Sequence, residues 1–254
     1  MWRAGKFLEM KTVSWLVVVL VLWLLLTACR SADWSYEDSF EEPRINRYWT
    51  TMWWSRDGGV DDAFAVDGQH SLRVIVQEGD HRLFGKSGQS TERSELNERH
   101  RHKVGQDVWY AFRVYVPEDF PIQDTRLVMG QWKQTAIFLW KKHSPAVAQR
   151  FRNGRFQITI NNDAGREYLY EDGTADDPAL VGEWTSFVYH IRFDKGDNGR
   201  LEVWMNGEQI IDYSGQIGYK DDLNTSYFRL GLYRDTMAEP MTVYYDDVRV
   251  WYGD

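Results

Sequence analysis

The sequence predicts an all-β fold in which two antiparallel sheets pack face to face, as in a β-sandwich or a jelly roll. Short runs rich in β-branched and aromatic residues alternate with turn residues from Trp34 onward, which is the pattern of closely spaced strands. No stretch keeps the apolar period of a helix for more than about two turns. The chain has 254 residues, a length at which all-β chains often form one undivided domain.

The clearest strand signals run through the whole of this domain. The expected strands are 72–76, 109–116, 127–132, 135–140, 156–160, 184–193, 201–205, 209–213, 227–233 and 241–251. Pro117 ends the second strand, because proline has no N–H to give to a sheet. The dipeptide Asn206-Gly207 lies between two of the strands and is the strongest short-range signal for a β-hairpin.

One of the β-patterned segments carries an unusual row of charges. Alternate side chains of a strand share a face, so Arg93, Glu95 and Asn97 point one way while Ser94 and Leu96 point the other. A polar row of this kind persists where it lines a wet groove or pairs internally. The row is therefore either part of a ligand groove or a solvated sheet face.

Composition and charge narrow the class of partner. The 13 Trp and 14 Tyr residues suit a large core, and such rings also stack well on the flat faces of sugars. A net charge of -8 argues against a nucleic-acid partner. An acidic substrate would need a local basic patch, for which Arg93, Lys133, Arg229 and Arg234 are candidates. We expect a monomer.

The N-terminal segment has the features of a targeting signal. Lys6 and Lys11 precede an apolar run from Trp15 to Leu26, which is shorter than the roughly 20 residues that a membrane span needs. The run ends at Leu26-Thr27-Ala28-Cys29, which resembles the lipobox of bacterial lipoproteins. The resemblance implies that Cys29 is lipidated and becomes the mature N-terminus.

The expected organisation is a signal peptide over residues 1–29 and a single jelly-roll domain over residues 30–254. Met10 is an alternative start, and a plain signal peptide followed by a buried cysteine is the alternative to lipidation. Cys29 is the only cysteine, so no disulfide can form within the chain. Arg30 after the cysteine favours sorting to the outer membrane of a bacterial cell envelope.

Three motifs together resemble a known family. They are Glu92-Arg93-Ser94-Glu95-Leu96, Gly130-Gln131-Trp132-Lys133-Gln134 and the segment from Tyr227 to Arg234. In this order they resemble the jelly-roll polysaccharide lyases, namely the heparin lyase I-like and glucuronan lyase families and, more distantly, the alginate lyases. The hairpin at 199–207 and the ending at 244–250 resemble the concanavalin-like jelly roll, in which a concave sheet holds polysaccharide.

The resemblance implies a β-elimination on a uronic-acid polymer. Such an enzyme removes the proton beside the uronate carboxylate and expels the glycosidic oxygen from the next carbon. Arg93 and Gln131 would neutralise the carboxylate and so stabilise the enolate-like intermediate. Tyr233 stands at the family's catalytic tyrosine and would protonate the leaving oxygen. The remaining contacts to substrate are assigned to Glu95, which would also orient Arg93, and to Asn97, Trp132, Arg229 and Arg234.

The identity of the base stays open. Lys133 stands where the alginate lyases have a histidine, and Arg229 stands where they have a lysine. Tyr233 could act as both base and acid, Lys133 could act if burial lowered its pKa, and His81 could reach the groove from a loop. The polymer is equally open, since alginate, glucuronan, heparin-like chains and ulvan all carry uronates.

Two other functions and one metal site were considered. A glycoside hydrolase needs two facing carboxylates, but alternation places Glu95 on the opposite face from Glu92 and Glu98. A glycan-binding protein without catalysis would use the same groove. No cofactor is expected, although Asp246 and Asp247 together with Glu37 could hold a structural calcium.

Overall fold

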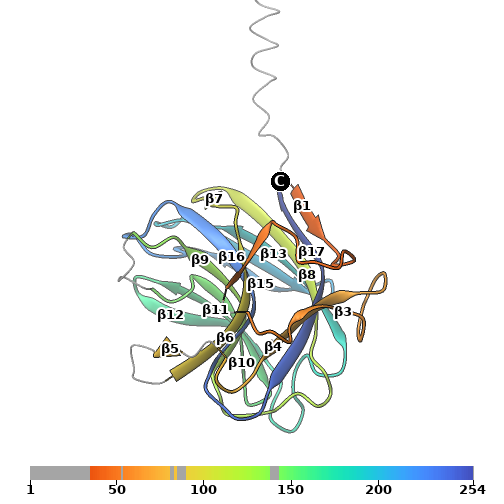
Figure 1. Cartoon of the computed structure of the whole chain (residues 1–254). Helices are drawn as coiled ribbons and strands as arrows, with labels where there is room; N and C mark the ends of the chain where they lie inside the picture. Colours follow the sequence, from red (N-terminus) through yellow and green to blue (C-terminus); the bar gives the residue numbers. More distant parts are fainter. Residues whose placement is uncertain (1–34, 53, 81–82, 85–89, 138–142, 254) are drawn as a thin grey trace, which may run out of the picture. The chain divides into compact units, whose positions relative to one another are not determined.

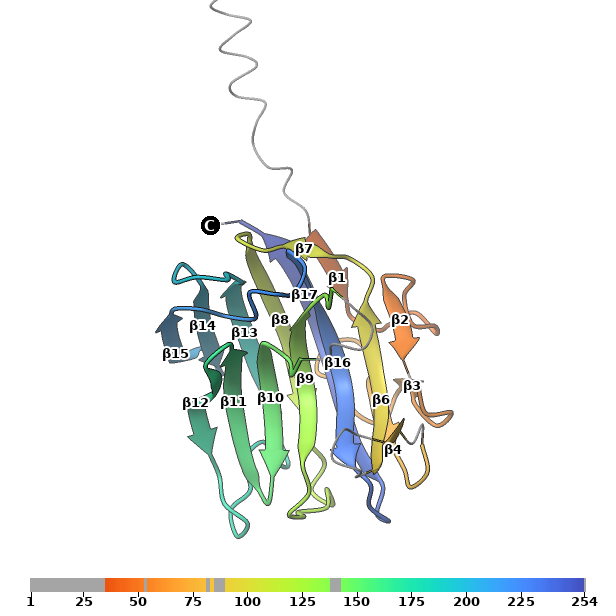
Figure 2. The same cartoon turned by 90° about the vertical axis from the view of Figure 1, so that its left-hand side faces the viewer.

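Two antiparallel β-sheets make up the described part of the chain (Figures 1 and 2). The computed structural model describes residues 35–52, 54–80, 83–84, 90–137 and 143–253. Among these residues every regular element is a strand, which confirms the predicted fold class.

The sheet that faces the viewer in Figure 2 is called the front sheet here. Its strand order is β12 (Gly165–Asp172), β11 (Arg155–Asn162), β10 (Val147–Arg152), β9 (Leu127–Gln134), β16 (Thr225–Asp235), β6 (Ser90–Glu98) and β2 (Trp49–Met52). Two short strands join it, β5 (Leu83–Phe84) beside β6 and β7 (His102–Lys103) beside β16.

The back sheet lies behind it. Its order is β15 (Glu208–Ser214), β14 (Arg200–Met205), β13 (Trp184–Arg192), β8 (Asp107–Tyr115), β17 (Met241–Tyr252), β4 (Ser71–Val76) and β3 (Gly59–Asp61), with β1 (Ser35–Asp38) paired to β17. Strands far apart in sequence are neighbours in both sheets. The first and last strands of the described chain are one example, because β1 pairs with β17.

Nine of the ten expected strands are present, and their ends lie within two residues of the predicted ones. The exception is the predicted strand at 135–140. β9 runs on to Gln134, so there is no break after Trp132, and residues 135–137 lie outside any strand. The rest of that prediction lies outside the described residues. Several strands were not predicted from the sequence, among them β10, which pairs with β9 and borders the candidate site described below.

Large aromatic side chains fill the space between the sheets. Trp132 of β9 is fully buried and stacks on Phe228 of β16, with 4.6 Å between the ring centroids. Its ring also lies 4.3 Å from that of Tyr189 in the back sheet. Trp132 therefore packs in the core, and its assignment to substrate contact is wrong. Such rings bury large apolar areas and contribute strongly to folding.

A buried ion pair joins β6 to β16 on the core side of the front sheet. Glu92 and Arg234 lie opposite each other in the strand register and are both fully buried. Arg234 Nε and Nη2 lie 3.0 and 2.9 Å from Glu92 Oε2, and Nη2 also donates to the carbonyl of Met237. The assignment of Arg234 to substrate contact is therefore wrong, because its charge is directed inward.

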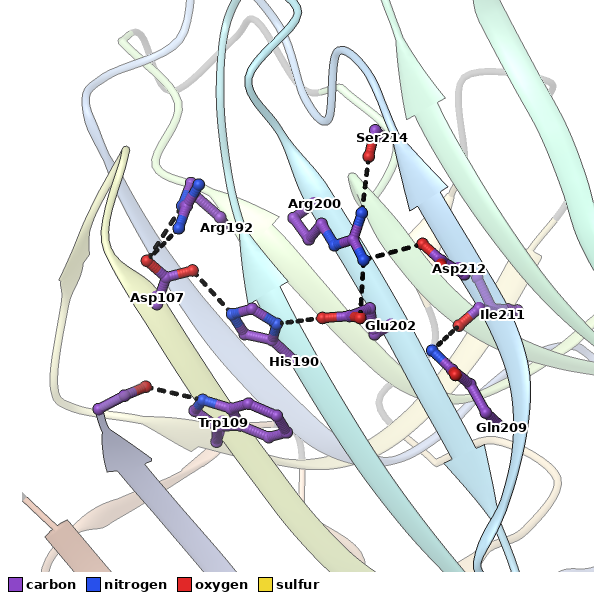
Figure 3. A network of polar contacts seen from close by, with 11 residues as sticks. Asp107, Trp109, His190, Arg192, Arg200, Glu202, Gln209, Ile211, Asp212 and Ser214 are labelled. Atoms are coloured by element: carbon purple, nitrogen blue, oxygen red, sulfur yellow. Dashed lines mark hydrogen bonds and ion pairs between the residues drawn. The ribbon is translucent and has the colours of Figure 1, made fainter.

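The outer face of the back sheet carries a network of charged side chains that links strands β8, β13 and β14 (Figure 3). The ring of His190 stacks on Trp109 with 4.4 Å between centroids, and each ring nitrogen lies 2.7 Å from a carboxylate oxygen. The carboxylates belong to Asp107 and Glu202, which also pair with arginines of β13 and β14. His190 is thus a structural residue.

We predict that Arg234→Met lowers the free energy of unfolding by about 3–5 kcal/mol, because it leaves the Glu92 carboxylate buried without its partner. The matched control is Arg249→Met, which removes an exposed arginine 3.9 Å from Glu37 and should cost no more than about 1 kcal/mol. Urea unfolding of both variants measures the difference. Equal stabilities for the two variants would show that the buried ion pair contributes no more to the free energy of unfolding than the exposed pair does.

Candidate active site

Three neighbouring strands of the front sheet bring the predicted catalytic residues together. Asn97 of β6, Arg229 of β16 and Gln131 of β9 lie directly opposite one another. Arg93 lies opposite Tyr233, and Lys133 opposite Tyr227. Because these positions alternate with the core residues Leu96, Phe228 and Trp132, their side chains share the face that points away from the back sheet. We call this face the polar face.

Glu95 lies at the centre of the polar face and is only 1% exposed. Its Oε2 lies 3.0 Å from Arg93 Nε and 4.0 Å from Arg229 Nη1, and its Oε1 accepts a hydrogen bond from the amide of Gln131. One hydrogen bond and two ion pairs therefore hold these three side chains around a single carboxylate. Glu95 thus pairs with Arg93, while its burial contradicts a direct contact with substrate.

Gln131 is also buried, at 2% exposed. Its amide nitrogen is directed at Glu95, so in this structure it holds that carboxylate in place. Arg93 is more open, with 16% of its side chain exposed. Its pairing with Glu95 uses Nε, and within the described residues no partner is found for its two terminal nitrogens. Arg93 is therefore the group best placed to bind an incoming carboxylate with two parallel hydrogen bonds.

Arg229 is held from two sides. Its Nε donates to Asn97 Oδ1 at 3.1 Å, and its Nη2 donates to the hydroxyl of Tyr227 at 3.3 Å. Asn97 in turn donates to the backbone carbonyl of Glu98 at 3.1 Å and is 7% exposed. Asn97 thus positions Arg229, and Tyr227 does so as well, although sequence reasoning gave Tyr227 no role.

Tyr233 lies between two arginines. The guanidinium carbon of Arg93 is 4.1 Å from its ring centroid and that of Arg126 is 4.8 Å away. Arg126 Nη2 donates to the Tyr233 hydroxyl at 3.3 Å and is itself fixed by an ion pair with Asp235. The hydroxyl oxygen accepts from Arg126, so its own proton is free to point toward a ligand. The same arginine would stabilise the phenolate left after that proton is given away.

Gly231 makes this arrangement of Tyr233 possible. It has a φ of +131°, and a Cβ at this position would lie 2.4 Å from the backbone oxygen of Ser94. Only glycine adopts this positive φ without strain and has no Cβ to collide with Ser94. The register between β16 and β9 shifts between Leu230 and Tyr233, which brings Tyr233 opposite Val128.

Lys133 has an electrostatic setting suited to a base. Its Nζ donates to the backbone carbonyl of His143 at 3.0 Å. Burial, followed by the positive charges of Arg229 and Arg93, lowers the pKa of Lys133 to about 8. Lys133 is therefore still mostly charged at neutral pH, but far more of it is the neutral amine than for an ordinary lysine, and only that form can accept a proton.

His81 and Cys29 lie outside the described residues. His143 lies beside Lys133 and stacks on Tyr219, with 4.0 Å between the ring centroids. Together with Asp221 and Asp222 it forms the one group found among the described residues whose side chains could hold a metal ion. The acids proposed for calcium have other partners: Asp246 accepts from the amide of Val66, Asp247 pairs with Arg113, and Glu37 with Arg249.

The fold and the polar face define a jelly-roll protein with a cluster of cationic side chains on the outer face of its front sheet. A family model described as polysaccharide lyase matches residues 40–249, and the chain belongs to that family. The protein is therefore a polysaccharide lyase. The search of curated proteins gave no significant match.

Solved structures agree with this fold. An endo-β-1,4-glucuronan lyase from the fungus Trichoderma reesei superposes with a TM-score of 0.66 at 17% identity, over 86% of this chain and 95% of that one. An alginate lyase of polysaccharide lyase family 7 gives 0.53 at 15% identity, over 79% and 84% of the two chains. A cellulose-induced protein gives 0.54 at 15% identity, over 85% and 96%. At these identities the structures show a shared fold.

Proposed function

We propose that the protein cleaves a uronic-acid-containing polysaccharide by β-elimination and leaves an unsaturated uronate end. The observation that carries this proposal is the arrangement around Glu95. There Arg93, which has two terminal nitrogens without a partner among the described residues, shares the polar face with Lys133, whose pKa is lowered, and with Tyr233, whose hydroxyl is held by Arg126. The similarity to glucuronan and alginate lyases supports it, since both substrates named in those structures are polymers of uronic acids.

The proposed reaction begins with the substrate carboxylate on Arg93. The paired charge makes the proton on the neighbouring ring carbon more acidic, because it stabilises the negative charge that develops when this proton leaves. The neutral amine of Lys133 takes the proton, and the released electron pair forms the carbon–carbon double bond. The bond from the next carbon to the glycosidic oxygen breaks at the same time or afterwards. Tyr233 gives its proton to that oxygen, and Arg126 stabilises the resulting phenolate.

Hydrolysis on the same face lacks the carboxylates that it requires. Glu92 and Glu98 are fully buried, and Glu92 is paired with Arg234. Glu95 faces the polar face, but it is held by Arg93 and Gln131. Glycoside hydrolysis needs two open carboxyl groups on either side of a sugar. The side chains described on the polar face therefore suit elimination better than hydrolysis.

We predict that the protein produces material absorbing in the ultraviolet from at least one uronate polymer, because elimination creates a double bond conjugated to the carboxylate. Tyr233→Phe should lower turnover at least about 10²-fold, which is the lower range for a positioned acid–base group. Folding should change by no more than about 1 kcal/mol, the usual net value of one hydrogen bond.

The assay follows absorbance and new reducing ends in parallel with alginate, glucuronan, heparin-like chains and ulvan. New reducing ends without absorbance would indicate hydrolysis and contradict the proposal. Saturable binding without cleavage of any polymer would reduce the protein's role to glycan recognition. A Tyr233→Phe variant with more than about a tenth of the wild-type turnover would remove Tyr233 from the acid role.

We predict that kcat/KM rises with pH up to about 8 and then levels off, because the neutral amine of Lys133 accumulates as pH approaches its pKa. In kcat the same rise should lie at higher pH, because a bound carboxylate favours the charged amine. Lys133→Arg keeps a positive charge but removes the base, so turnover should fall at least about 10²-fold at every pH. A profile that falls through pH 8, or a Lys133→Arg variant that keeps the rise, would rule out Lys133 as the base.

We further propose that the chain is a lipoprotein of a bacterial cell envelope, carried at the outer membrane by a lipid on Cys29. The support is the sequence of the apolar run and of Leu26 to Cys29. Within the part of the chain that the structure describes, no helix is long and apolar enough to cross a membrane. An anchored lyase would act on polymer at the cell surface or in the periplasm.

We predict that Cys29→Ser abolishes labelling by radioactive palmitate and releases the protein from the membrane fraction, because serine has no thiol to carry the lipid. Ser31→Ala is the matched control and should remain labelled and membrane-bound. Fractionation of bacterial cells that express each variant measures both properties. Membrane association of Cys29→Ser at the wild-type level would contradict lipid anchoring.

A further inference from the structure

Arg150 of β10 extends the polar face beyond the three motif strands. Its Cα lies opposite Val128 of β9, which in turn lies opposite Tyr233, and Tyr233 lies opposite Arg93. Arg93 and Arg150 are therefore the two ends of one row that crosses four strands. The Arg150 side chain points to the polar face, because its Nε donates to Thr159 at 3.0 Å. The adjacent residue Gln149 points the other way and donates to the hydroxyl of Tyr189 in the core.

The charge of Arg150 has no carboxylate partner within the described residues. Arg150 is only 7% exposed, yet the one side-chain hydrogen bond found for it among the described residues is to the hydroxyl of Thr159. Burial, followed by the positive charge of Arg166, lowers the pKa of Arg150 to about 10. A buried cation normally needs an anionic partner, as Arg234 has in Glu92.

The spacing separates this cation from the catalytic one. Neighbouring strands lie about 4.8 Å apart, so the three steps from β6 to β10 place the two arginine backbones roughly 14 Å apart. Two strands, which carry Tyr233 and Val128, lie between the two arginines, so this spacing suits two separate anionic groups better than one shared carboxylate. An extended polysaccharide that lies across the strands would instead present anionic groups on two different sugar units.

We propose that Arg150 forms a second anion-binding subsite, which takes a carboxylate or a sulfate on a sugar unit remote from the one held by Arg93. This inference rests on the proposed function, because it assumes that an acidic polysaccharide lies on the polar face. The enzyme then prefers chains with closely spaced charges over chains in which the cleaved uronate is flanked by neutral sugars.

The test uses three oligosaccharides of one length that share the same cleaved uronate. The first is uronate throughout, the second has its other carboxyl groups reduced to alcohols, and the third carries sulfate esters on those reduced units. Wild-type kcat/KM should be at least about tenfold higher on the first than on the second, the scale of one hydrogen bond to a charged group. Activity on the third shows whether sulfate substitutes for carboxylate.

Arg150→Met should lower kcat/KM on the first oligosaccharide to the level of the second and leave the second unchanged. Arg150→Lys should retain part of the preference, since it keeps the charge but not the planar fork. The control is Arg152→Met on the same strand, which removes an exposed arginine paired with Asp124 and should preserve the preference. Thermal unfolding checks that the variants fold.

Equal losses for Arg150→Met on the first and second oligosaccharides would overturn the proposal, because they would show a structural effect. If the wild type cleaves neither, the proposed elimination fails, and calorimetric binding then decides the subsite separately. A tenfold or greater loss of affinity for the all-uronate oligosaccharide in Arg150→Met would still support it. Unchanged affinity would overturn it.

Discussion

The buried carboxylate of Glu95 is the interaction on which the candidate site depends. It gathers Arg93, Gln131 and Arg229 from three strands around a single negative charge. Without it, two arginines and a lysine would face one another on one sheet with no anion between them. Glu95 pairs with Arg93 through Nε, so within the described residues the two terminal nitrogens of Arg93 are left for a ligand. The site is thus ordered in the absence of substrate, which reduces the entropic cost of binding.

Strand alternation allows one short segment to serve both the core and the site. Glu92 and Glu98 face inward, where each has a buried partner, while Arg93, Glu95 and Asn97 face outward. A shift of one residue in the register of β6 would exchange these two sets and bury the cation of Arg93. The inward ion pair between Glu92 and Arg234 opposes such a shift, because only the observed register places the two residues opposite each other. The core thereby fixes the geometry of the polar face.

The sequence was sufficient to predict those features that follow from the alternation of side chains along a strand. It predicted the all-β fold, most strands and the shared face of Arg93, Glu95 and Asn97, because alternation is local. The same rule places Arg234 and Trp132 on the core side, since they alternate with Tyr233 and Lys133. Their assignment to substrate contact followed motif position and ignored this rule, and their burial contradicts it.

What the sequence could not provide is the pairing of strands. Arg126 and Arg150 reach the site only through neighbours in the sheet, and β10 was not predicted at all. Its apolar alternation is hidden by Gln149, a polar residue that faces the core and is satisfied by the hydroxyl of Tyr189. The register also shifts between Gln149 and Arg150. No pattern in the single strand reveals that Arg150 lies in the row of Tyr233.

The positive charge of the polar face links the binding of substrate to the strength of the base. Burial, followed by the charges of Arg229 and Arg93, lowers the pKa of Lys133, so part of this amine is neutral before substrate arrives. A substrate carboxylate on Arg93 reduces that effect and favours the protonated amine, which is also what the amine must become when it accepts the substrate proton. The bound anion therefore makes Lys133 a stronger base at the moment when its proton transfer is needed. The net charge of -8 does not oppose this arrangement, because exposed charges beyond about 8–10 Å are screened by salt while the cations of the polar face act directly on the ligand.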